Sequence, residues 1–234
     1  MAELEKRQVG VLIPAFNEEK NIGPLVKDLK AFGVEVLVVD DGSTEKTAEE
    51  ARRAGAHLLR SEKNHGKGAS LRLGVDWFLG RGYQALVFMD ADGQHDAGEL
   101  PVFLKALAGG DKVIVGNRMR SPGEMPALRR ATNRFLSWIL SLAAGQKIPD
   151  SQCGYRAVSR EVLERIQLDT DRFETESEIL LEASRLGHKI ISVPVRSMYE
   201  GGVSNIHPVW DTFRFLRFLT GYLFRRALQA KKRS

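Results

Sequence analysis

Residues 86–96 read LVFMDADGQHD, an apolar run followed at once by two carboxylates, a glycine and a glutamine. The apolar run has the length of a buried strand, so it predicts a strand that ends near Met89. Asp90 and Asp92 would then lie at the carboxyl edge of a sheet, where open α/β folds bind ligands. Carboxylate and amide oxygens are hard ligands, so Asp90, Asp92 and Gln94 favour Mg²⁺ or Mn²⁺ over zinc.

Three other interpretations of this motif compete with a metal site. An EF-hand loop needs glycine and glutamate at the positions that His95 and Pro101 occupy here, which excludes it. A phosphatase of the haloacid dehalogenase type also has Asp-x-Asp-Gly after a strand. Its motif continues with a hydroxyl residue and usually opens the chain, whereas Gln94 follows here in mid-chain. An acidic turn that only ends the strand remains open.

Length and composition limit the class of protein. The 234 residues suffice for one sizeable α/β core, and we expect a single domain at 1–207 with an appendage at 208–234. The single cysteine, Cys153, excludes an internal disulfide and a Cys-rich zinc site. The charged N-terminus lacks the apolar segment of a signal peptide, so a cytoplasmic location is expected. A net charge of +5 implies an anionic partner: nucleic acid, a phosphorylated substrate or an anionic membrane.

Strands and helices alternate along the chain. The predicted strands cover residues 8–13, 34–39, 56–60, 86–89, 112–115 and 189–195. A helix follows each of the first four strands, which is typical of a mostly parallel sheet with right-handed crossovers. The predicted fold class is therefore α/β.

Polar loops follow these strands. Residues 14–18 read PAFNE, residues 40–44 read DDGST, and residues 64–68 read NHGKG just before a helix. In the last loop, backbone N–H groups and Lys67 can face an anion, although the spacing is too short for a Walker A loop. Arg118 would share the edge with Asp90 and Asp92 and is a candidate phosphate ligand. Ordinary turn, capping and ion-pair roles stay open for all of these residues.

Two predicted helices combine arginines with apolar residues. In the helix at 128–144, one polar stripe is formed by Arg130, Arg134, Ser137 and Ser141. A core helix with a solvated face is an alternative for it. The tail at 208–234 contains seven Arg and Lys residues and one acid, with an aromatic and apolar opposite face. This pattern is typical of a helix in a membrane interface, whereas packing against the domain or a second subunit is the alternative.

Seven short motifs occur in order along the chain. They lie at residues 14–18, 40–43, 64–68, 90–95, 116–118, 152–157 and 173–176. Together they resemble family 2 glycosyltransferases of the GT-A fold, most of all the polyprenyl-phosphate branch typified by dolichol-phosphate mannose synthase. The chain departs from that pattern at Asn205, where many members have a lysine, so the resemblance implies no phosphate contact there.

The resemblance implies a role for each motif. The nucleotide would be bound by Pro14, Ala15, Asn17, Glu18, Asp41, Lys67 and Asp90. The divalent metal would be held by Asp90, Asp92 and Gln94. The acceptor phosphate would meet Arg118, Arg130 and Arg134, and the sugar site would be shaped by Gln152, Arg156, Glu174 and Glu176. The catalytic group would be Asp90, Asp92 and Arg118.

The resemblance also implies a reaction. A sugar, mannose or glucose, would move with inversion from a GDP- or UDP-linked donor to a polyprenyl or dolichyl phosphate, with Mg²⁺ or Mn²⁺ as cofactor. The enzyme would be attached peripherally to the cytoplasmic face of an anionic membrane and would not bind nucleic acid. A lipid phosphate is anionic at neutral pH and needs no general base, whereas a hydroxyl acceptor would need one. A hydroxyl acceptor, a metal-dependent phosphatase and a non-catalytic binding module are the alternatives.

Overall fold

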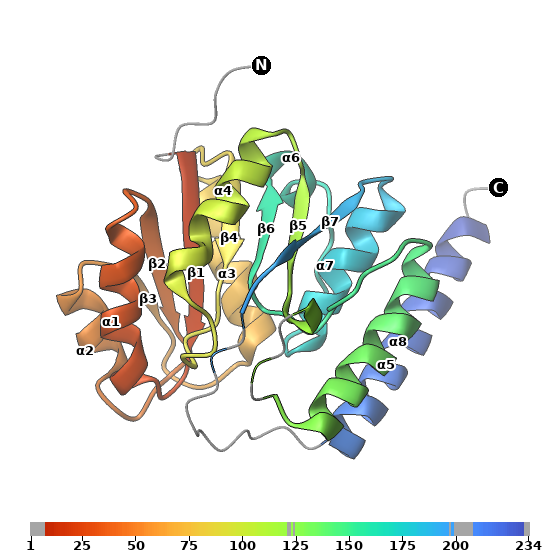
Figure 1. Ribbon diagram of the computed structural model, residues 1–234, viewed down its shortest axis with the longest axis horizontal. Coiled ribbons are helices and arrows are strands. Elements are labelled where there is room, and N and C mark those ends of the chain that lie inside the picture. The colour runs from red at the N-terminus through yellow and green to blue at the C-terminus, as the bar shows by residue number, and fades with distance from the viewer. Residues whose placement is uncertain (1–7, 121–122, 124, 197, 199–207, 232–234) are drawn as a thin grey trace.

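A seven-stranded sheet forms the centre of the protein, with helices on both of its faces (Figure 1). The computed structural model describes residues 8–120, 123, 125–196, 198 and 208–231. Across the sheet the strands lie in the order β3 (His57–Arg60), β2 (Glu35–Asp40), β1 (Val9–Ala15), β4 (Ala85–Phe88), β6 (Arg156–Ser159), β5 (Val113–Asn117) and β7 (Ile190–Pro194).

Only β6 breaks the parallel order of the described strands. It runs antiparallel to both of its neighbours, β4 and β5, while every other neighbouring pair is parallel. The predicted α/β class and mostly parallel sheet are therefore confirmed. β6 itself is absent from the predicted strands because its four residues, RAVS, include a charged and a polar side chain, although all four are buried.

The described helices connect and cover the strands. They are α1 (Glu19–Lys30), α2 (Thr47–Arg53), α3 (Lys67–Leu79), η2 (Ala97–Glu99), α4 (Leu100–Ala108), η3 (Arg118–Arg120), α5 (Ala127–Ala144), α6 (Arg160–Leu163), α7 (Glu174–Arg185) and α8 (Pro208–Lys231). In Figure 1, α4 crosses in front of the sheet, whereas α3 and α7 lie behind it. At one end of the molecule α5 lies beside α8, and α5 also contacts α7.

Close packing of α3 on β1 positions the start of that helix. A Cβ atom on Gly10 of β1 would lie 2.0 Å from Phe78, and one on Gly74 of α3 would lie 2.2 Å from Leu12. Glycine at both positions therefore lets the helix and the strand approach each other. Because α3 leads back across the sheet to β4, its first residue, Lys67, lies at the carboxyl edge of the parallel strands.

The helix predicted at 128–144 is present as α5, but its exposed face differs from the predicted polar stripe. Ser137 Oγ accepts a hydrogen bond from the Ser151 N–H at 2.8 Å, and Ser141 Oγ accepts one from the Ile148 N–H at 2.9 Å. The two hydroxyls thus face inward and satisfy a loop backbone. The exposed side carries four large apolar residues, between 47% and 67% exposed: Leu128, Phe135, Trp138 and Leu142.

The C-terminal helix α8 begins at Pro208, where the appendage was predicted to begin. One face of α8 docks on the domain, because Phe215, Leu219 and Tyr222 are only 5% to 6% exposed. A second face is exposed and carries Phe213, Leu216, Leu223 and Phe224. Packing on the domain is therefore confirmed for one face, while the separate status of 208–234 stays a prediction. Within the described ranges, no helix is both long and apolar enough to cross a membrane.

Candidate active site

The candidate active site lies where the loops after β1, β2 and β4 leave the sheet. Ala15 of β1 pairs with Asp40 of β2, and Leu12 of β1 pairs with Phe88 of β4. The three loops therefore begin side by side at the carboxyl edge. This is the edge at which open α/β sheets bind ligands.

Asn17 joins the β1 loop to the β2 loop. Its N–H donates to Ser43 Oγ at 2.9 Å, and its Oδ1 accepts from the Thr44 N–H at 2.9 Å. The φ of 57° at Asn17 is a left-handed conformation that asparagine tolerates better than most residues. The next residue, Glu18, donates its N–H to Thr47 Oγ1 at 2.9 Å. Both residues thus fix the relative positions of the two loops.

Asp41 holds the glycine-lysine loop that precedes α3. Its two carboxylate oxygens accept from the His65 N–H at 2.9 Å and from the Gly66 N–H at 2.8 Å. Gly66 has a φ of 99°, and a Cβ there would lie 2.4 Å from the Asp171 carbonyl oxygen, so the loop requires glycine. Asp41 therefore positions Lys67, and its predicted contact with the nucleotide stays a prediction.

Lys67 bridges two carboxylates from distant parts of the chain. Its Nζ lies 2.5 Å from Asp90 Oδ1 and 2.9 Å from Glu176 Oε1. Burial alone would lower the pKa of Lys67, but the two carboxylates outweigh it and raise this pKa above its ordinary value. Burial alone would raise the pKa of Asp90, but Lys67, with His95, holds that pKa below its usual range. Lys67 and Asp90 are therefore both charged at neutral pH.

Asp92 and Gln94 continue the motif on its exposed side. Asp92 Oδ1 accepts from the Gln94 N–H at 3.0 Å, and Gln94 Oε1 accepts from Arg129 Nη2 at 3.3 Å. The pKa of the nearby Glu18 is raised, first by burial, and the charges of Asp92 and Asp90 add to this effect. Negative charge therefore accumulates between the β1 and β4 loops.

This donor set fits a hard divalent cation that keeps other ligands. Among the residues that the structure describes, no three His, Cys, Asp or Glu side chains are placed to hold a metal by themselves. Asp90, Asp92 and Gln94 offer carboxylate and amide oxygens, and Mg²⁺ sites commonly combine one or two carboxylates with water and substrate phosphates. Asp90 also needs Gly154, since a Cβ there would lie 2.2 Å from its Oδ2. The residues thus fit the predicted Mg²⁺ or Mn²⁺ with a diphosphate completing the ligands.

Arg118 makes a different contact from the one predicted. Its Nε and Nη2 donate to the two carboxylate oxygens of Asp150 at 2.8 and 3.0 Å, and its N–H also donates to Asp150 at 3.1 Å. The side chain is 3% exposed. A guanidinium bound to a carboxylate in this bidentate way makes strong, charge-assisted hydrogen bonds. The roles of Arg118 as an acceptor-phosphate ligand and catalytic residue stay predictions, and the contact that the structure shows for this side chain is the one with Asp150.

Arg156 is also buried, and its side chain binds backbone carbonyl groups. The side chain is almost fully enclosed, its Nε donates to the Cys153 carbonyl at 3.0 Å, and its Nη1 donates to the Glu176 carbonyl. Arg156 thereby connects the turn before β6 to the first turn of α7, which places Glu176 opposite Lys67. Its predicted contact with the sugar stays a prediction.

The other predicted residues lie around this centre. Pro14 is half-buried and Ala15 buried at the end of β1, and Gln152 donates to Ser151 Oγ at 3.0 Å. Glu174 begins α7, and α5 carries Arg130 and the exposed Arg134. No hydrogen bond or ion pair among the described residues joins Gln152, Glu174, Arg130 or Arg134 to Lys67 or Asp90. Asn205 lies outside the described residues.

Two residues near the motif were not predicted. Arg129 donates to Gln94, whereas Arg130 and Arg134 were the arginines of this helix predicted to meet the acceptor phosphate. His95 is buried, with Nε2 3.8 Å from Asp90 Oδ2. Packing determines which face of α5 turns toward the motif. The sequence therefore gives no signal for a role of Arg129 other than its position beside Arg130.

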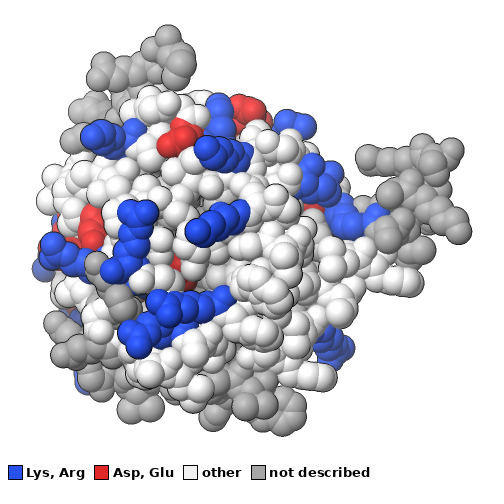
Figure 2. Space-filling model, turned by 45° about the vertical axis from the view of Figure 1, so that its right-hand side comes forward, with Lys and Arg blue, Asp and Glu red and all other residues white. Residues whose placement is uncertain are grey.

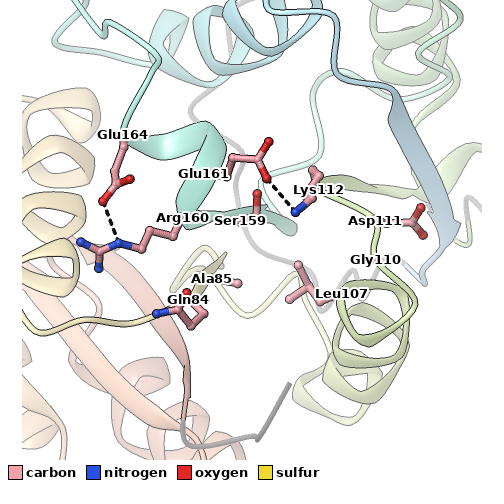
Figure 3. A pocket seen from close by; sticks show the side chains of 10 residues that line it. All are labelled: Gln84, Ala85, Leu107, Gly110, Asp111, Lys112, Ser159, Arg160, Glu161 and Glu164. Atoms are coloured by element: carbon pink, nitrogen blue, oxygen red, sulfur yellow. Dashed lines mark ion pairs between the residues drawn. The ribbon is translucent and has the colours of Figure 1, made fainter. Parts of the chain in front are cut away.

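A separate cavity of about 350 Å³ lies at the opposite edge of the sheet (Figure 3). Its lining includes Ala85 at the start of β4 and Ser159 at the end of the antiparallel β6. Two ion pairs, Lys112–Glu161 at 2.8 Å and Arg160–Glu164 at 2.7 Å, flank it. Since none of its lining residues belongs to the candidate site, this cavity is distinct from the predicted donor site.

A mostly parallel sheet with carboxylates after its central strand is compatible with a glycosyltransferase of the GT-A fold, and comparison with known families decides the class. Residues 10–167 match the family described as glycosyl transferase family 2, and the chain belongs to this family. The resemblance given by the seven motifs is therefore confirmed, and the protein is a glycosyltransferase.

Relatives with similar sequences cover most of the chain. An uncharacterized protein of Methanocaldococcus jannaschii is 37% identical over 204 residues, which cover 84% of each chain. A polyprenol monophosphomannose synthase of Mycolicibacterium smegmatis is 34% identical over 200 residues, which cover 79% of this chain and 75% of the relative. A UDP-N-acetylglucosamine–dolichyl-phosphate N-acetylglucosaminyltransferase of Methanococcus voltae is 31% identical over 213 residues, which cover 81% and 85%. Enzymes of polyprenyl phosphates are thus among its relatives.

A solved structure confirms the fold. Glucosyl-3-phosphoglycerate synthase from Mycobacterium tuberculosis, in complex with Mn²⁺, UDP and phosphoglyceric acid, superposes with a TM-score of 0.72. The comparison covers 94% of this chain and 78% of that chain at 21% identity. At this identity the similarity concerns the fold alone, and the fold is the predicted GT-A fold.

Proposed function

We propose that this enzyme transfers a sugar from a nucleotide-diphosphate sugar to a polyprenyl or dolichyl phosphate, with Mg²⁺ or Mn²⁺ as cofactor. The observation on which this rests is the charged group at the carboxyl edge, in which Lys67 joins Asp90 to Glu176 and the motif continues to Asp92 and Gln94. The names of the relatives support the acceptor class. Mannose and glucose, and GDP and UDP, stay equal candidates for the donor.

On the donor side, the joined β1 and β2 loops form the wall for the nucleotide. Asn17 and Asp41 hold these loops in place, and Pro14, Ala15 and Glu18 would line the space between them. Asp90, Asp92 and Gln94 would hold the divalent cation on the diphosphate. When bound, that cation stabilises the charge that develops on the departing diphosphate.

On the acceptor side, an oxygen of the lipid phosphate attacks the sugar C1 from the face opposite the diphosphate. The bond between C1 and the donor phosphate oxygen breaks, the nucleoside diphosphate leaves with the electron pair, and the anomeric centre inverts. The attacking phosphate is already anionic at neutral pH, so it needs cationic positioning rather than a base. Arg129, beside Gln94, joins Arg118 as a candidate for this task, with Arg130 and Arg134 farther along α5.

An exposed apolar surface would bring the enzyme to its lipid substrate. We define the α5–α8 surface as Leu128, Phe135, Trp138 and Leu142 of α5 with Phe213, Leu216, Leu223 and Phe224 of α8. Four exposed arginines, Arg134, Arg214, Arg217 and Arg225, lie on the same two helices. Figure 2 turns this end of the molecule toward the viewer, and more Lys and Arg than Asp and Glu side chains are visible.

The composition of the α5–α8 surface fits a peripheral membrane contact. Apolar side chains bury in the headgroup region, and each nearby cation adds about 1 kcal/mol at an anionic leaflet. This surface also lies on the helix that carries Arg129, Arg130 and Arg134. A lipid phosphate held at the membrane would therefore meet these arginines, and the cytoplasmic leaflet is the proposed location.

A thermal-shift panel of nucleotide sugars with and without Mn²⁺ tests the donor half of this proposal. Ligands that bind the native state raise the melting temperature, so a GDP- or UDP-sugar should raise it, and more strongly with Mn²⁺. No shift with any nucleotide sugar would contradict the proposal. Release of inorganic phosphate from a phosphomonoester, with no sugar nucleotide present, would instead favour the phosphatase alternative.

A further inference from the structure

The Lys67 ammonium is fixed on several sides. Its contacts with Asp90 and Glu176 are ion pairs, and the ring centroid of Phe173 lies 5.8 Å from its Nζ. The side chain of Lys67 is 15% exposed, and that of Glu176 is 13% exposed. Its backbone begins α3, directly after the loop that Asp41 holds. The cation is therefore a built part of the site rather than a mobile surface charge.

The carboxylate that Lys67 holds is also the one proposed to bind the metal. Oδ1 of Asp90 faces Lys67, while Oδ2 faces His95 and Gly154. Asp92, by contrast, is exposed. A divalent cation on Asp90 would share this carboxylate with an ammonium that lies 2.5 Å from its Oδ1, and the two positive charges would repel each other.

We propose that Lys67 is the resident counter-ion of the donor site, which opposes binding of the divalent cation to Asp90 until a donor diphosphate is present. The inference rests on the proposed metal site at Asp90, Asp92 and Gln94. The diphosphate brings enough negative charge to accompany both the ammonium and the metal. Metal and donor therefore bind with positive coupling, and each raises the affinity for the other by the same factor.

Removing the ammonium has an effect that a structural role alone does not produce. Without Lys67, Asp90 and Glu176 lose the cation between them. A divalent cation then becomes the remaining counter-ion, so its affinity for the donor-free protein rises. A lysine that only supported the fold would leave metal affinity unchanged or lower when removed.

The test is a titration of the full chain with Mn²⁺, in which electron paramagnetic resonance reports free Mn²⁺, with and without UDP or GDP. Lys67→Met should bind Mn²⁺ without nucleotide about tenfold more tightly than wild type, and the nucleotide should improve Mn²⁺ affinity less than in wild type. Arg72→Met is the matched control, because Arg72 also lies on α3 and pairs with Asp171 rather than Asp90. It should resemble wild type, as should Lys67→Arg, which keeps the charge.

Unchanged or weaker Mn²⁺ binding by Lys67→Met without nucleotide would overturn the inference. If that variant does not fold, Lys67→Gln is measured in its place, because it keeps a hydrogen-bond donor but no charge. Tighter Mn²⁺ binding without nucleotide is again the expected result, and unchanged or weaker binding again overturns the inference. Failure of wild type to bind Mn²⁺ even with UDP or GDP would overturn the proposed metal site and the inference together. The wild-type titration alone thus separates the two failures.

Discussion

The carboxylate of Glu182 on α7 accepts a hydrogen bond of 2.6 Å from the Tyr222 hydroxyl on α8. The Glu182 side chain is fully buried, and it also pairs with Arg185 at 2.9 Å and with Arg226 of α8. A buried carboxylate with these partners fixes α8 to the domain. Removing the tail after residue 206 would therefore expose a packed face of the domain, and it would not test membrane contact by itself.

Glu182→Gln should destabilise the protein by about 3 kcal/mol, because it removes the charge of the buried carboxylate that pairs with Arg185 and Arg226. Urea unfolding of the full chain measures this change. The control is Glu164→Gln, which removes an exposed pair with Arg160 and should cost less than about 1 kcal/mol. Equal effects of the two substitutions would show that Glu182 does not hold α8.

The contribution of Glu182 should depend on pH. Burial alone would raise its pKa, but Arg185, Tyr222 and Arg226 outweigh burial and lower this pKa below the ordinary 4.5. A lowered pKa in the folded state means that the stabilisation is complete above the ordinary value and is lost as the pH falls through the folded value. The difference in unfolding free energy between wild type and Glu182→Gln should therefore shrink between about pH 6 and about pH 3. A constant difference over this range would contradict the assignment.

Asp41→Ala should weaken binding of UDP or GDP and lower stability by about 1 to 3 kcal/mol, because two loop N–H groups lose their acceptors. Asp41→Asn keeps one acceptor oxygen and should have a smaller effect on both. Isothermal titration and urea unfolding measure the two quantities, with the exposed Asp76→Ala on α3 as control. If Asp41→Ala is destabilised but binds UDP and GDP with unchanged affinity, the loop at 64–68 is not part of the nucleotide site.

The α5–α8 surface can be tested without disturbing the fold. Phe135 and Trp138 are 47% and 59% exposed, so the double change to serine should alter stability by no more than about 0.5 kcal/mol per site. It should reduce sedimentation with anionic liposomes and raise the KM for long polyprenyl phosphates more than for short soluble analogues. The control is Val102→Ser on α4, an apolar residue that is 38% exposed and outside this surface. Liposome binding equal to that of the control would reject the membrane contact.

The sheet and the position of Asp90 were predictable because local signals determine them. An apolar run of strand length predicts where a strand ends, and parallel crossovers bring such ends to one edge. β6 escaped prediction because its short, partly polar sequence is buried only through its two neighbouring strands.

Contacts between distant residues were not predictable from local signals. Arg118 pairs with Asp150, and Lys67 pairs with Glu176, which follows it by 109 residues. The sequence contains both members of each pair but no signal that joins them. The outward face of α5 was also not predictable, because a serine hydroxyl can form hydrogen bonds either with water or with a loop backbone.

The most direct test of the proposed function is formation of a lipid-linked sugar from labelled GDP- and UDP-sugars and a polyprenyl phosphate, measured for wild type and Asp92→Asn. We expect wild type with Mg²⁺ or Mn²⁺ to form the product and release nucleoside diphosphate, and excess EDTA to stop the reaction. Asp92→Asn should keep the wild-type melting curve and lose at least about 100-fold in rate, which corresponds to about 2.7 kcal/mol of transition-state stabilisation. Full turnover by Asp92→Asn, or by wild type in excess EDTA, would contradict the account.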